Sequence, residues 1–222
     1  MIEERVFLSL NKGERIFAIG DIHGCLTRLR NLFEKLPINW DTDYLVFLGD
    51  YIDRGEDPKG VIDFVLSLKK SHFNRVFTLM GNHEDMFLSF LSGRDISTFL
   101  YNGGDATLRS YHHKGGFVLP EEHEEFFENL ILMLETEDYV FVHAGINPLK
   151  PLNLQEKEDV LWIRGSFYRF SGKLPKTVVF GHTPFPEPLV KEDRIGIDTG
   201  CVYGGALTCV LLPEKKFFQV KC

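Results

Sequence analysis

Five short apolar runs in this chain each end at a glycine beside a polar residue of a type that binds metal ions. They read IFAIGD at 16–21, LVFLGD at 45–50, VFTLMGN at 76–82, YVFVHAG at 139–145 and VVFGH at 178–182. Runs rich in Val, Ile and Phe that end at glycine are typical of buried strands, because glycine lets the backbone turn sharply. The pattern therefore predicts buried strands whose ends carry polar side chains.

Amphipathic helices are predicted after the first three of these strands. Residues 26–36 place leucine and phenylalanine on one helix face, and residues 61–68 repeat that spacing after Asp57-Pro58, a favourable N-cap followed by proline. Residues 86–91 begin a third helix. Strand–helix–strand alternation predicts right-handed parallel units, whose ligands bind beyond the carboxyl ends of the strands. We therefore expect the polar strand-end residues to converge at one place.

The middle and the end of the chain complete the expected fold. Residues 92–138 hold two glycine-rich stretches and an acidic helix-like stretch, so we expect a helical and loop insertion near the site. Residues 194–198, 206–212 and 216–220 are strand-like. A mixed sheet or a two-layer sandwich flanked by helices is therefore predicted. The length of 222 residues suits one domain with one core.

The composition excludes several classes of protein. The 44% hydrophobic share is too high for a disordered chain, and no apolar run approaches the roughly 18 residues of a membrane helix. The balance of 25 basic and 32 acidic residues disfavours a broad contact with nucleic acid, although a local phosphate pocket remains compatible with it. The start of the chain does not resemble a secretory signal, and the four cysteines form no C-x-x-C pair, so we expect a reduced, cytoplasmic protein without a membrane partner.

Six of the strand-end residues can bind divalent cations through oxygen or nitrogen. They are Asp21, His23, Asp50, Asn82, His143 and His182. Residues i and i+2 of an extended segment point the same way, so Asp21 and His23 can reach one cation. If Asp50 bridges two cations, the six residues make seven contacts. Such a set without thiolate suits Mn, Fe, Zn or Co, and two ions about 3.5–4 Å apart can bind a hydroxide and a phosphoryl oxygen together.

Four further residues have the chemistry that phosphoryl transfer needs beside the metals. The guanidinium of Arg54, in Asp-Arg-Gly, matches the geometry of phosphate oxygens, and Arg164 is a second candidate. His83 follows Asn82 directly and can protonate a leaving oxygen without being a metal ligand. Asp53 can accept the other ring proton of His83 and thereby orient the imidazole.

These motifs resemble a known family. The series GDIHG (20–24), GDYIDRG (49–55), GNHE (81–84), HAG (143–145) and GHT (181–183) is similar to that of the PPP-type phosphoprotein phosphatases, within the calcineurin-like metallophosphoesterases. The resemblance is strongest to the short bacterial and phage-lambda-type branch. It implies one catalytic domain over residues 1–222, with an α/β/β/α fold in which a central two-sheet mixed β-sandwich is flanked by helices.

The resemblance also implies a dinuclear centre of two divalent ions, with Mn²⁺ expected first and Fe, Zn or Co as alternatives. One ion is expected on Asp21, His23 and Asp50, and the other on Asp50, Asn82, His143 and His182. Phosphate binding is expected of Arg54, Arg164 and Asn82, and proton donation of the dyad His83–Asp53. Hydrolysis then proceeds by direct attack of metal-bound hydroxide, without a phosphoenzyme.

The sequence leaves the substrate open. GDYIDRG is the protein-phosphatase-like form of the second motif, which favours a serine/threonine, or tyrosine, protein phosphatase acting on a phosphoprotein or small phosphoester. The alternative is a bis(5'-nucleosyl)-tetraphosphatase, because DTGCVYGGALT at 198–208 is also similar to bacterial dinucleoside tetraphosphate hydrolases. A nucleotide substrate needs an aromatic shelf, for which Tyr51, Tyr101 and Tyr203 are candidates. A non-catalytic binding scaffold is disfavoured because every expected ligand is present.

Overall fold

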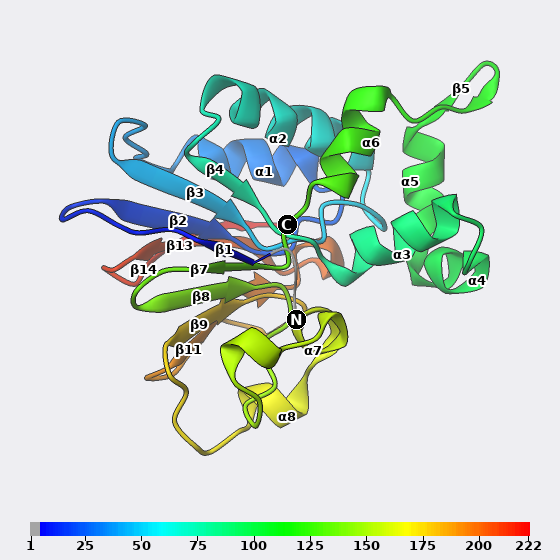
Figure 1. Ribbon diagram of the computed structural model, residues 1–222. Helices are drawn as coiled ribbons and strands as arrows, with labels where there is room; N and C mark the ends of the chain where they lie inside the picture. Colours follow the sequence, from blue (N-terminus) through cyan, green and yellow to red (C-terminus); the bar gives the residue numbers. More distant parts are fainter. Residues whose placement is uncertain (1–4) are drawn as a thin grey trace.

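The computed structural model describes residues 5–222, and its core is formed by two sheets that pack face to face (Figure 1). The first, sheet A, has the strand order β1-β7-β8-β9-β11-β10, and the second, sheet B, has the order β12-β13-β2-β3-β4 with β14 paired to β13. Sheet A comprises β1 (Arg5–Phe7), β7 (Met133–Glu135), β8 (Tyr139–Val142), β9 (Thr177–Phe180), β10 (Leu189–Val190) and β11 (Arg194–Gly196). Sheet B comprises β2 (Arg15–Ile19), β3 (Asp43–Phe47), β4 (Val76–Thr78), β12 (Asp198–Thr199), β13 (Ala206–Leu212) and β14 (Lys216–Lys221).

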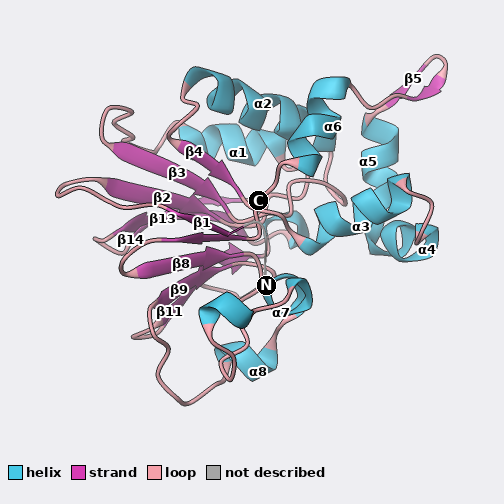
Figure 2. Cartoon of the chain, viewed as in Figure 1, coloured by secondary structure: helices cyan, strands magenta, loops and turns pink. Residues whose placement is uncertain are grey.

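Helices cover the outer faces of both sheets (Figure 2). The outer face of sheet B carries α1 (Leu26–Phe33) and α2 (Pro58–Ser71), while α7 (Lys157–Trp162) and α8 (Gly165–Tyr168) lie beside sheet A. The confirmed fold class is therefore α/β, with mixed sheets flanked by helices as in the metallophosphoesterase fold. None of the helices in the described range 5–222 is long and apolar enough to cross a membrane.

Strand residues alternate between two apolar clusters, as the period-two geometry of a strand requires. In β2, Ile16 and Ala18 point into the cluster between the two sheets, where Val179 of β9 also lies. Phe17 and Ile19, from the same strand, point instead toward the helices. All four β2 side chains are at most 1% exposed, which explains why the run is continuously apolar.

The third helix begins earlier than the sequence predicts. Helix α3 runs over Asn82–Leu91 instead of beginning at Met86, and Gly81 is its N-cap. The Glu84 carboxylate accepts the Gly81 backbone N–H at 3.0 Å, which stabilises the first turn. Two candidate site residues, Asn82 and His83, therefore occupy a rigid helical turn.

The region predicted as an insertion contains several short elements and one strand of the core. It holds α4 (Ile96–Phe99), the π-helical segment η1 (Leu100–Gly104), α5 (Asp105–Ser110), the hairpin β5 (His112–His113) with β6 (Gly116–Phe117), and α6 (Glu121–Glu128). The structure differs from the prediction at the end of the region, because β7 pairs with β1 and β8 in sheet A. A three-residue strand is too short to show a period in the sequence.

Asp43 at the start of β3 should contribute measurably to stability. Its buried carboxylate accepts hydrogen bonds from Arg15 Nε at 3.0 Å, Arg15 Nη2 at 2.6 Å and the backbone N–H of Asn39 at 2.8 Å. We expect Asp43→Asn to lower the free energy of unfolding by about 2 kcal/mol at pH 7, in the range of hydrogen bonds to charged groups. Urea melts at pH 7 measure the loss.

The contribution of the Asp43–Arg15 pair to stability depends on pH in a defined direction. Burial by itself favours a higher pKa for Asp43, but Arg15 and the Asn39 N–H hold that pKa below the usual aspartate value. A lowered native pKa means that the contribution is complete above the usual pKa and is lost as the pH falls through the native one. The difference between wild type and Asp43→Asn should therefore shrink as the pH falls below 3.8, the usual aspartate pKa. A difference that is as large at pH 2 as at pH 7 would contradict this ionic role.

Candidate metal centre and its cavity

The strand-end residues converge on a cavity of about 260 Å³. Eight of the residues singled out in the sequence line it, namely Asp21, His23, Asp50, Arg54, Asn82, His83, Arg164 and His182. His143 lies just beneath, with its Nε2 atom 2.9 Å from Asn82 Oδ1. Asp53 is buried behind His83. The structure therefore brings together all ten residues predicted for the site.

Unusual backbone conformations concentrate in these strand-end loops. Residues His23, Asp50, Asp53, Arg54 and His182 have φ between 46° and 69°, and Lys215 is the only other non-glycine residue in the described range with positive φ. Each such residue costs about 1–3 kcal/mol and persists only where its surroundings fix it. The strain shows that the loops hold these side chains in position at a cost in stability, as functional sites commonly do.

Backbone carbonyls set the orientation of two imidazoles. His23 Nδ1 lies 2.8 Å from the Ile52 carbonyl, and His143 Nδ1 lies 2.9 Å from the Leu48 carbonyl. A proton on each Nδ1 makes these hydrogen bonds and leaves the Nε2 lone pair directed into the site, which is the tautomer that a metal ligand needs.

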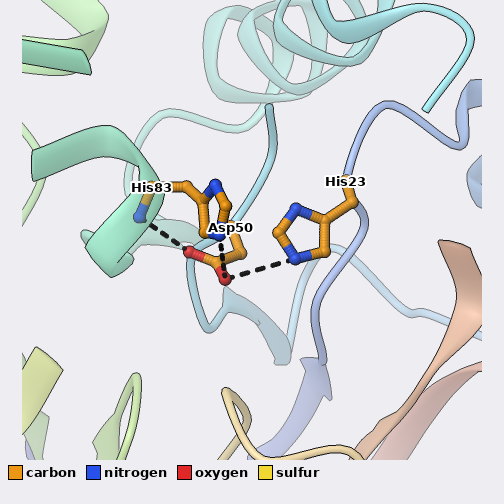
Figure 3. A group of neighbouring side chains, drawn as sticks. All are labelled: His23, Asp50 and His83. Carbon is orange, nitrogen blue, oxygen red and sulfur yellow. Dashed lines mark hydrogen bonds and ion pairs between the residues drawn. The ribbon is translucent and has the colours of Figure 1, made fainter. Parts of the chain in front are cut away.

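Asp50 is the residue shared by two groups of candidate ligands. Its Oδ2 atom lies 3.4 Å from His23 Nε2 and 4.0 Å from His83 Nε2 (Figure 3). Its Oδ1 atom lies 3.4 Å from His143 Nε2, in a group that also includes His182. In each group the ligand atoms lie within 4.8 Å of one another. A carboxylate between two such groups has the geometry that a bridging ligand requires.

Burial makes the imidazoles neutral. It lowers the pKa of His23 and of His143 to about 3, and that of His182 to about 2. The cation of Arg54 acts in the same direction on His23. Because protons do not compete for these nitrogens at neutral pH, their lone pairs are available to a metal ion.

Burial has the opposite effect on the carboxyl groups. It raises the pKa of Asp21, and the charges of Asp198 and Asp50 add to that effect. It also raises the pKa of Asp50, where the nearby Glu84 charge adds to it. Several buried acids close to one another are costly unless positive charge lies between them.

The donor set fits divalent cations. His182 Nε2 is buried without a hydrogen-bond partner in the described part of the chain, and its Nδ1 lies 2.9 Å from Asn82 Oδ1. His182 Nδ1, His143 Nε2 and Asn82 Oδ1 thus face one another near the Asp50 carboxylate, and such a set of nitrogen and oxygen ligands suits a divalent cation. The resemblance noted in the sequence implies such ions, and the residues present here suit them.

The Asp21 carboxylate also binds the backbone of another loop of the site. Its two carboxylate oxygens accept the backbone N–H of His182 at 3.1 and 3.0 Å. This contact ties the end of β2 to the end of β9. Gly181 allows the approach, because a side chain there would place its Cβ 2.0 Å from Asp21 Oδ1.

His83 and Asp53 form the predicted pair. His83 Nδ1 lies 2.6 Å from Asp53 Oδ2, and both side chains are at most 2% exposed. Burial raises the pKa of Asp53 to about 8 and lowers that of His83. A hydrogen bond of this length needs a proton between the ring nitrogen and the carboxylate oxygen, so the two groups titrate as a pair.

The region 92–138 contacts this pair, which the sequence could not show. Thr107 Oγ1 donates to Asp53 Oδ1 at 2.6 Å and accepts the Asp53 backbone N–H at 3.0 Å. The Gly103 carbonyl accepts the Arg54 N–H at 3.1 Å, and Gly103 itself has φ 97°. Segment η1 and helix α5 therefore position the Asp-Arg-Gly loop.

Two buried acids belong to the site although the sequence analysis did not select them. Glu84 accepts the backbone N–H groups of Asp50 at 2.8 Å and Tyr51 at 2.9 Å, and so joins the loop after β3 to helix α3. Asp198 lines the cavity, and burial raises its pKa to about 6. The predicted strand 194–198 ends at this aspartate, so the strand-end rule could have found it.

The two arginines differ in their surroundings. Arg54 Nη1 lies 2.5 Å from His23 Nε2, so the guanidinium reaches the nitrogen that a cation would take. Arg164 is more exposed, and its Nη1 donates to the His182 carbonyl at 3.3 Å. Both line the cavity. Two cations at the mouth of an acidic cluster suit a bound phosphoryl group.

The three tyrosines considered as an aromatic shelf differ in burial and in their position relative to the cavity. Tyr51 is buried and donates its hydroxyl to the Leu79 carbonyl at 2.9 Å. Tyr101 is 92% exposed and does not line the cavity. Tyr203 lines the cavity, is 65% exposed, and has the Arg54 guanidinium carbon 5.6 Å from its ring centre. Only Tyr203 is placed to stack on a base bound in this cavity.

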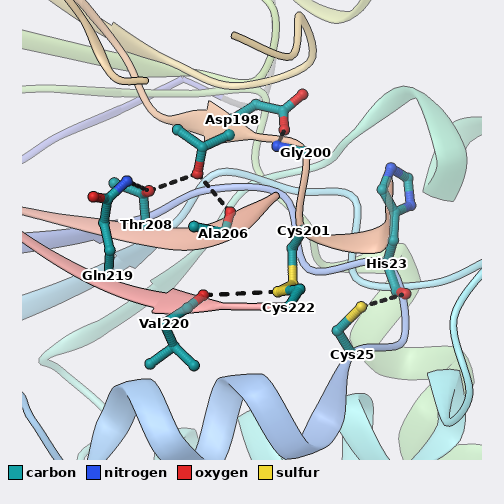
Figure 4. The surroundings of a disulfide bond; sticks show 11 residues. His23, Cys25, Asp198, Gly200, Cys201, Ala206, Thr208, Gln219, Val220 and Cys222 are labelled. Atoms are coloured by element: carbon teal, nitrogen blue, oxygen red, sulfur yellow. Dashed lines mark hydrogen bonds between the residues drawn. A yellow bond between two sulfur atoms is a disulfide. The ribbon is translucent and has the colours of Figure 1, made fainter. Parts of the chain in front are cut away.

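A disulfide joins Cys201, beside the cavity, to Cys222 at the C-terminal end of β14 (Figure 4). The expectation that the cysteines are reduced is therefore wrong for these two, while Cys25 and Cys209 are free. Strands β12 and β14 both pair with β13, and this brings two residues 21 apart in sequence to a Cα–Cα distance of 5.4 Å. The bond anchors η3 (Cys201–Tyr203), which carries Tyr203.

Reducing this disulfide should lower stability. A closed loop of this length is worth about 3 kcal/mol in the chain-entropy model. We expect urea unfolding with a phosphine reductant to show a loss of that size. The Cys222→Ser variant is the control, because it should unfold at the same urea concentration with and without reductant. If the reductant destabilised that variant equally, the loss of stability would not come from the Cys201–Cys222 disulfide.

The fold and the strand-end cluster define a metallophosphoesterase. The chain belongs to the calcineurin-like phosphoesterase family, whose sequence model matches residues 14–217. The protein is thus a hydrolase of a family that uses divalent metals.

Two relatives match nearly the whole chain. It is 31% identical to the asymmetrical bis(5'-nucleosyl)-tetraphosphatase PrpE of Anoxybacillus flavithermus, covering 91% of this chain and 92% of the relative. It is also 31% identical to the protein of the same name from Oceanobacillus iheyensis, covering 93% and 92%.

Solved structures agree on the fold. A crystal structure of a candidate diadenosine tetraphosphatase superimposes with a TM-score of 0.77 at 25% identity, covering 98% of this chain and 97% of the other. A serine/threonine phosphatase from Saccharomyces cerevisiae gives a TM-score of 0.71 at 18% identity, covering 98% and 83%, and shows the fold alone.

Proposed function

We propose that this protein is a metal-dependent hydrolase of dinucleoside polyphosphates that cleaves asymmetrically. The observation that carries the proposal is the similarity, along more than 90% of both chains, to relatives named asymmetrical bis(5'-nucleosyl)-tetraphosphatases. The exposed Tyr203 ring at the cavity supports it, since a nucleotide substrate requires an aromatic surface for its base. The alternative function considered from the sequence is thus favoured over the protein phosphatase.

In this proposal the site residues have distinct roles. Asp21, His23, Asp50, Asn82, His143 and His182 hold two divalent cations, for which Mn²⁺ is our first choice. Those cations supply Lewis acidity toward phosphoryl oxygens and lower the pKa of bound water. Arg54 and Arg164 bind the phosphoryl group and counter its charge as it redistributes during the reaction.

The pair His83–Asp53 is placed to act on the leaving group. His83 faces the cavity and can donate the proton on its Nε2 atom to a departing oxygen that is basic enough to need it, while Nδ1 keeps its hydrogen bond to Asp53. Asp53 holds the ring in place, and Thr107 holds Asp53. Asn82 lies at the junction, with its Oδ1 atom 2.9 Å from His143 Nε2 and from His182 Nδ1. Its amide orients either a cation or a phosphoryl oxygen.

A parallel assay tests the proposal. Diadenosine tetraphosphate and a phosphoserine peptide are supplied at equal concentration with Mn²⁺, and products are separated by anion exchange. We expect a higher kcat/KM for the dinucleotide, with AMP and ATP as products, because asymmetric cleavage divides four phosphates into one and three. Formation of ADP alone would contradict the asymmetric assignment.

The same assay judges the second candidate function. The motif GDYIDRG at 49–55 has the protein-phosphatase-like form, and that observation alone favours a phosphoprotein substrate. A higher kcat/KM for the phosphopeptide would establish that function instead and would reject the dinucleotide one.

Tyr203→Ala should weaken nucleotide binding selectively. Stacking of a base on an aromatic ring is worth about 1–3 kcal/mol, so we expect KM for diadenosine tetraphosphate to rise by about 5- to 150-fold. The matched control is Tyr101→Ala, which removes an exposed tyrosine that does not line the cavity. Steady-state kinetics measure the KM of both variants for diadenosine tetraphosphate. Equal KM values in the two would show that Tyr203 does not bind the base.

A further inference from the structure

A second cavity, of about 560 Å³, lies against the first. Arg54, Cys201 and Val202 line both cavities, so the two are neighbours along the Asp-Arg-Gly loop and η3. The disulfide contributes both of its cysteines to the lining, and Gly55 and Gly204 add no side chain. The second cavity is therefore roomy and adjacent to the candidate site.

The charge around this second cavity is positive. Three arginines, Arg28, Arg54 and Arg109, line it together with one acid, Glu56. The whole chain has a net charge of −7, so the excess of cations here is a local feature and does not follow from the composition. Local positive potential in a concave surface attracts polyanions.

The arginines come from three separate elements and are available to a ligand. Arg28 lies on α1, is partly exposed, and makes no hydrogen bond or ion pair with any residue in the range 5–222 that the structure describes. Arg109 lies on α5, forms an ion pair with Asp105 one helical turn earlier, and has a side chain that is 71% exposed. Their guanidinium groups can form paired hydrogen bonds with phosphate oxygens.

We propose that this second cavity binds the polyphosphate that extends beyond the cleaved phosphoryl group, with Arg28 and Arg109 contacting its phosphates. The inference rests on the proposed function, because only a substrate with several phosphates in series reaches both cavities. Arg54 stands between them and contacts the ligand where it passes from one to the other. The second cavity therefore distinguishes a polyphosphate substrate from a simple phosphomonoester.

The first arm of the test compares two substrates. Arg28→Gln and Arg109→Gln should each raise the KM for diadenosine tetraphosphate, relative to that for p-nitrophenyl phosphate, by about 10- to 150-fold, as expected for a lost charge-assisted hydrogen bond. The matched control is Arg30→Gln, an exposed arginine two residues further along α1 that does not line the cavity. Thermal melts verify that all three variants fold.

The second arm measures binding without turnover. Inorganic tripolyphosphate is titrated into each protein by calorimetry, and its Kd should rise by a similar factor in Arg28→Gln and Arg109→Gln only. If tripolyphosphate binding weakens while the KM for the dinucleotide stays at the wild-type value, the ligand is free polyphosphate and the assignment to the substrate is overturned.

The two proposals fail in different ways. Wild-type protein that cleaves no dinucleoside polyphosphate would overturn the proposed function, whatever the variants do. Wild-type protein that cleaves diadenosine tetraphosphate, with Arg28→Gln and Arg109→Gln equal to Arg30→Gln in both arms, would overturn the second cavity alone.

Discussion

Asp50→Asn should lower kcat by about 10³-fold or more and reduce the metal content of the purified protein. Asp50 is common to both groups of candidate ligands, with oxygens 3.4 Å from His23 Nε2 and 3.4 Å from His143 Nε2. Metal ions contribute several kcal/mol to such reactions, and each 1.36 kcal/mol is a factor of ten in rate. The neutral amide retains size while removing the charge that a bridging ligand needs.

Metal analysis by mass spectrometry and steady-state kinetics check this result together. Asp41→Asn is the control, because it makes the same chemical change at an exposed position. Chelator-treated wild type should be inactive and should recover with Mn²⁺ better than with Mg²⁺, since mixed imidazole and carboxylate ligation suits Mn²⁺ while Mg²⁺ prefers oxygen. Full activity of Asp50→Asn, or full metal content in it, would reject the bridging role.

His83→Asn should lose activity in proportion to how basic the leaving oxygen is. General acid catalysis is worth about 10²–10⁴ in rate, so we expect a loss in that range on phenyl phosphate, whose leaving oxygen needs a proton. The loss should be clearly smaller on p-nitrophenyl phosphate and on diadenosine tetraphosphate, whose leaving groups are stable anions. Metal content should stay at the wild-type value.

The metal content matters because His83 Nε2 also lies 4.0 Å from Asp50 Oδ2, in one of the two groups that could hold an ion. A variant that loses metal, or that loses equal activity on all three substrates, would make His83 a ligand and not an acid. Asp53→Asn should show the same dependence on leaving group more weakly, because Asp53 only orients the ring. The double variant should lose less than the product of the two single losses.

Much of this site could be predicted from the sequence because its signals are local. The apolar run 44–48, most of which forms strand β3, is followed by Gly49-Asp50, and such a run has few alternatives to a buried strand. The parallel order of β2, β3 and β4 follows from strand–helix–strand alternation, and it brings their carboxyl ends to one edge. The fold class and the family expected on these grounds are confirmed.

The supporting contacts could not be predicted, because they join residues that are distant in sequence. Thr107 holds Asp53 across 54 residues, and the Leu48 carbonyl orients His143 across 95. A threonine in a helix or a carbonyl at a strand end gives no sign of its partner. The sequence predicts the third helix from Met86, whereas it begins at Asn82, because the Glu84 carboxylate stabilises the first turn and also binds the distant loop after β3.

The sequence by itself thus determined the class of chemistry: buried strands, the polar residues at their ends, and the ligand types that divalent cations accept. Only the tertiary structure decided which tyrosine faces the cavity, that Cys201 and Cys222 are paired, and that Arg28 and Arg109 lie beside the same loop as Arg54. Secondary structure and ligand chemistry follow from short-range patterns. The shape and charge of a cavity depend on how separate elements pack together, and the local sequence of one element does not show which others it will contact.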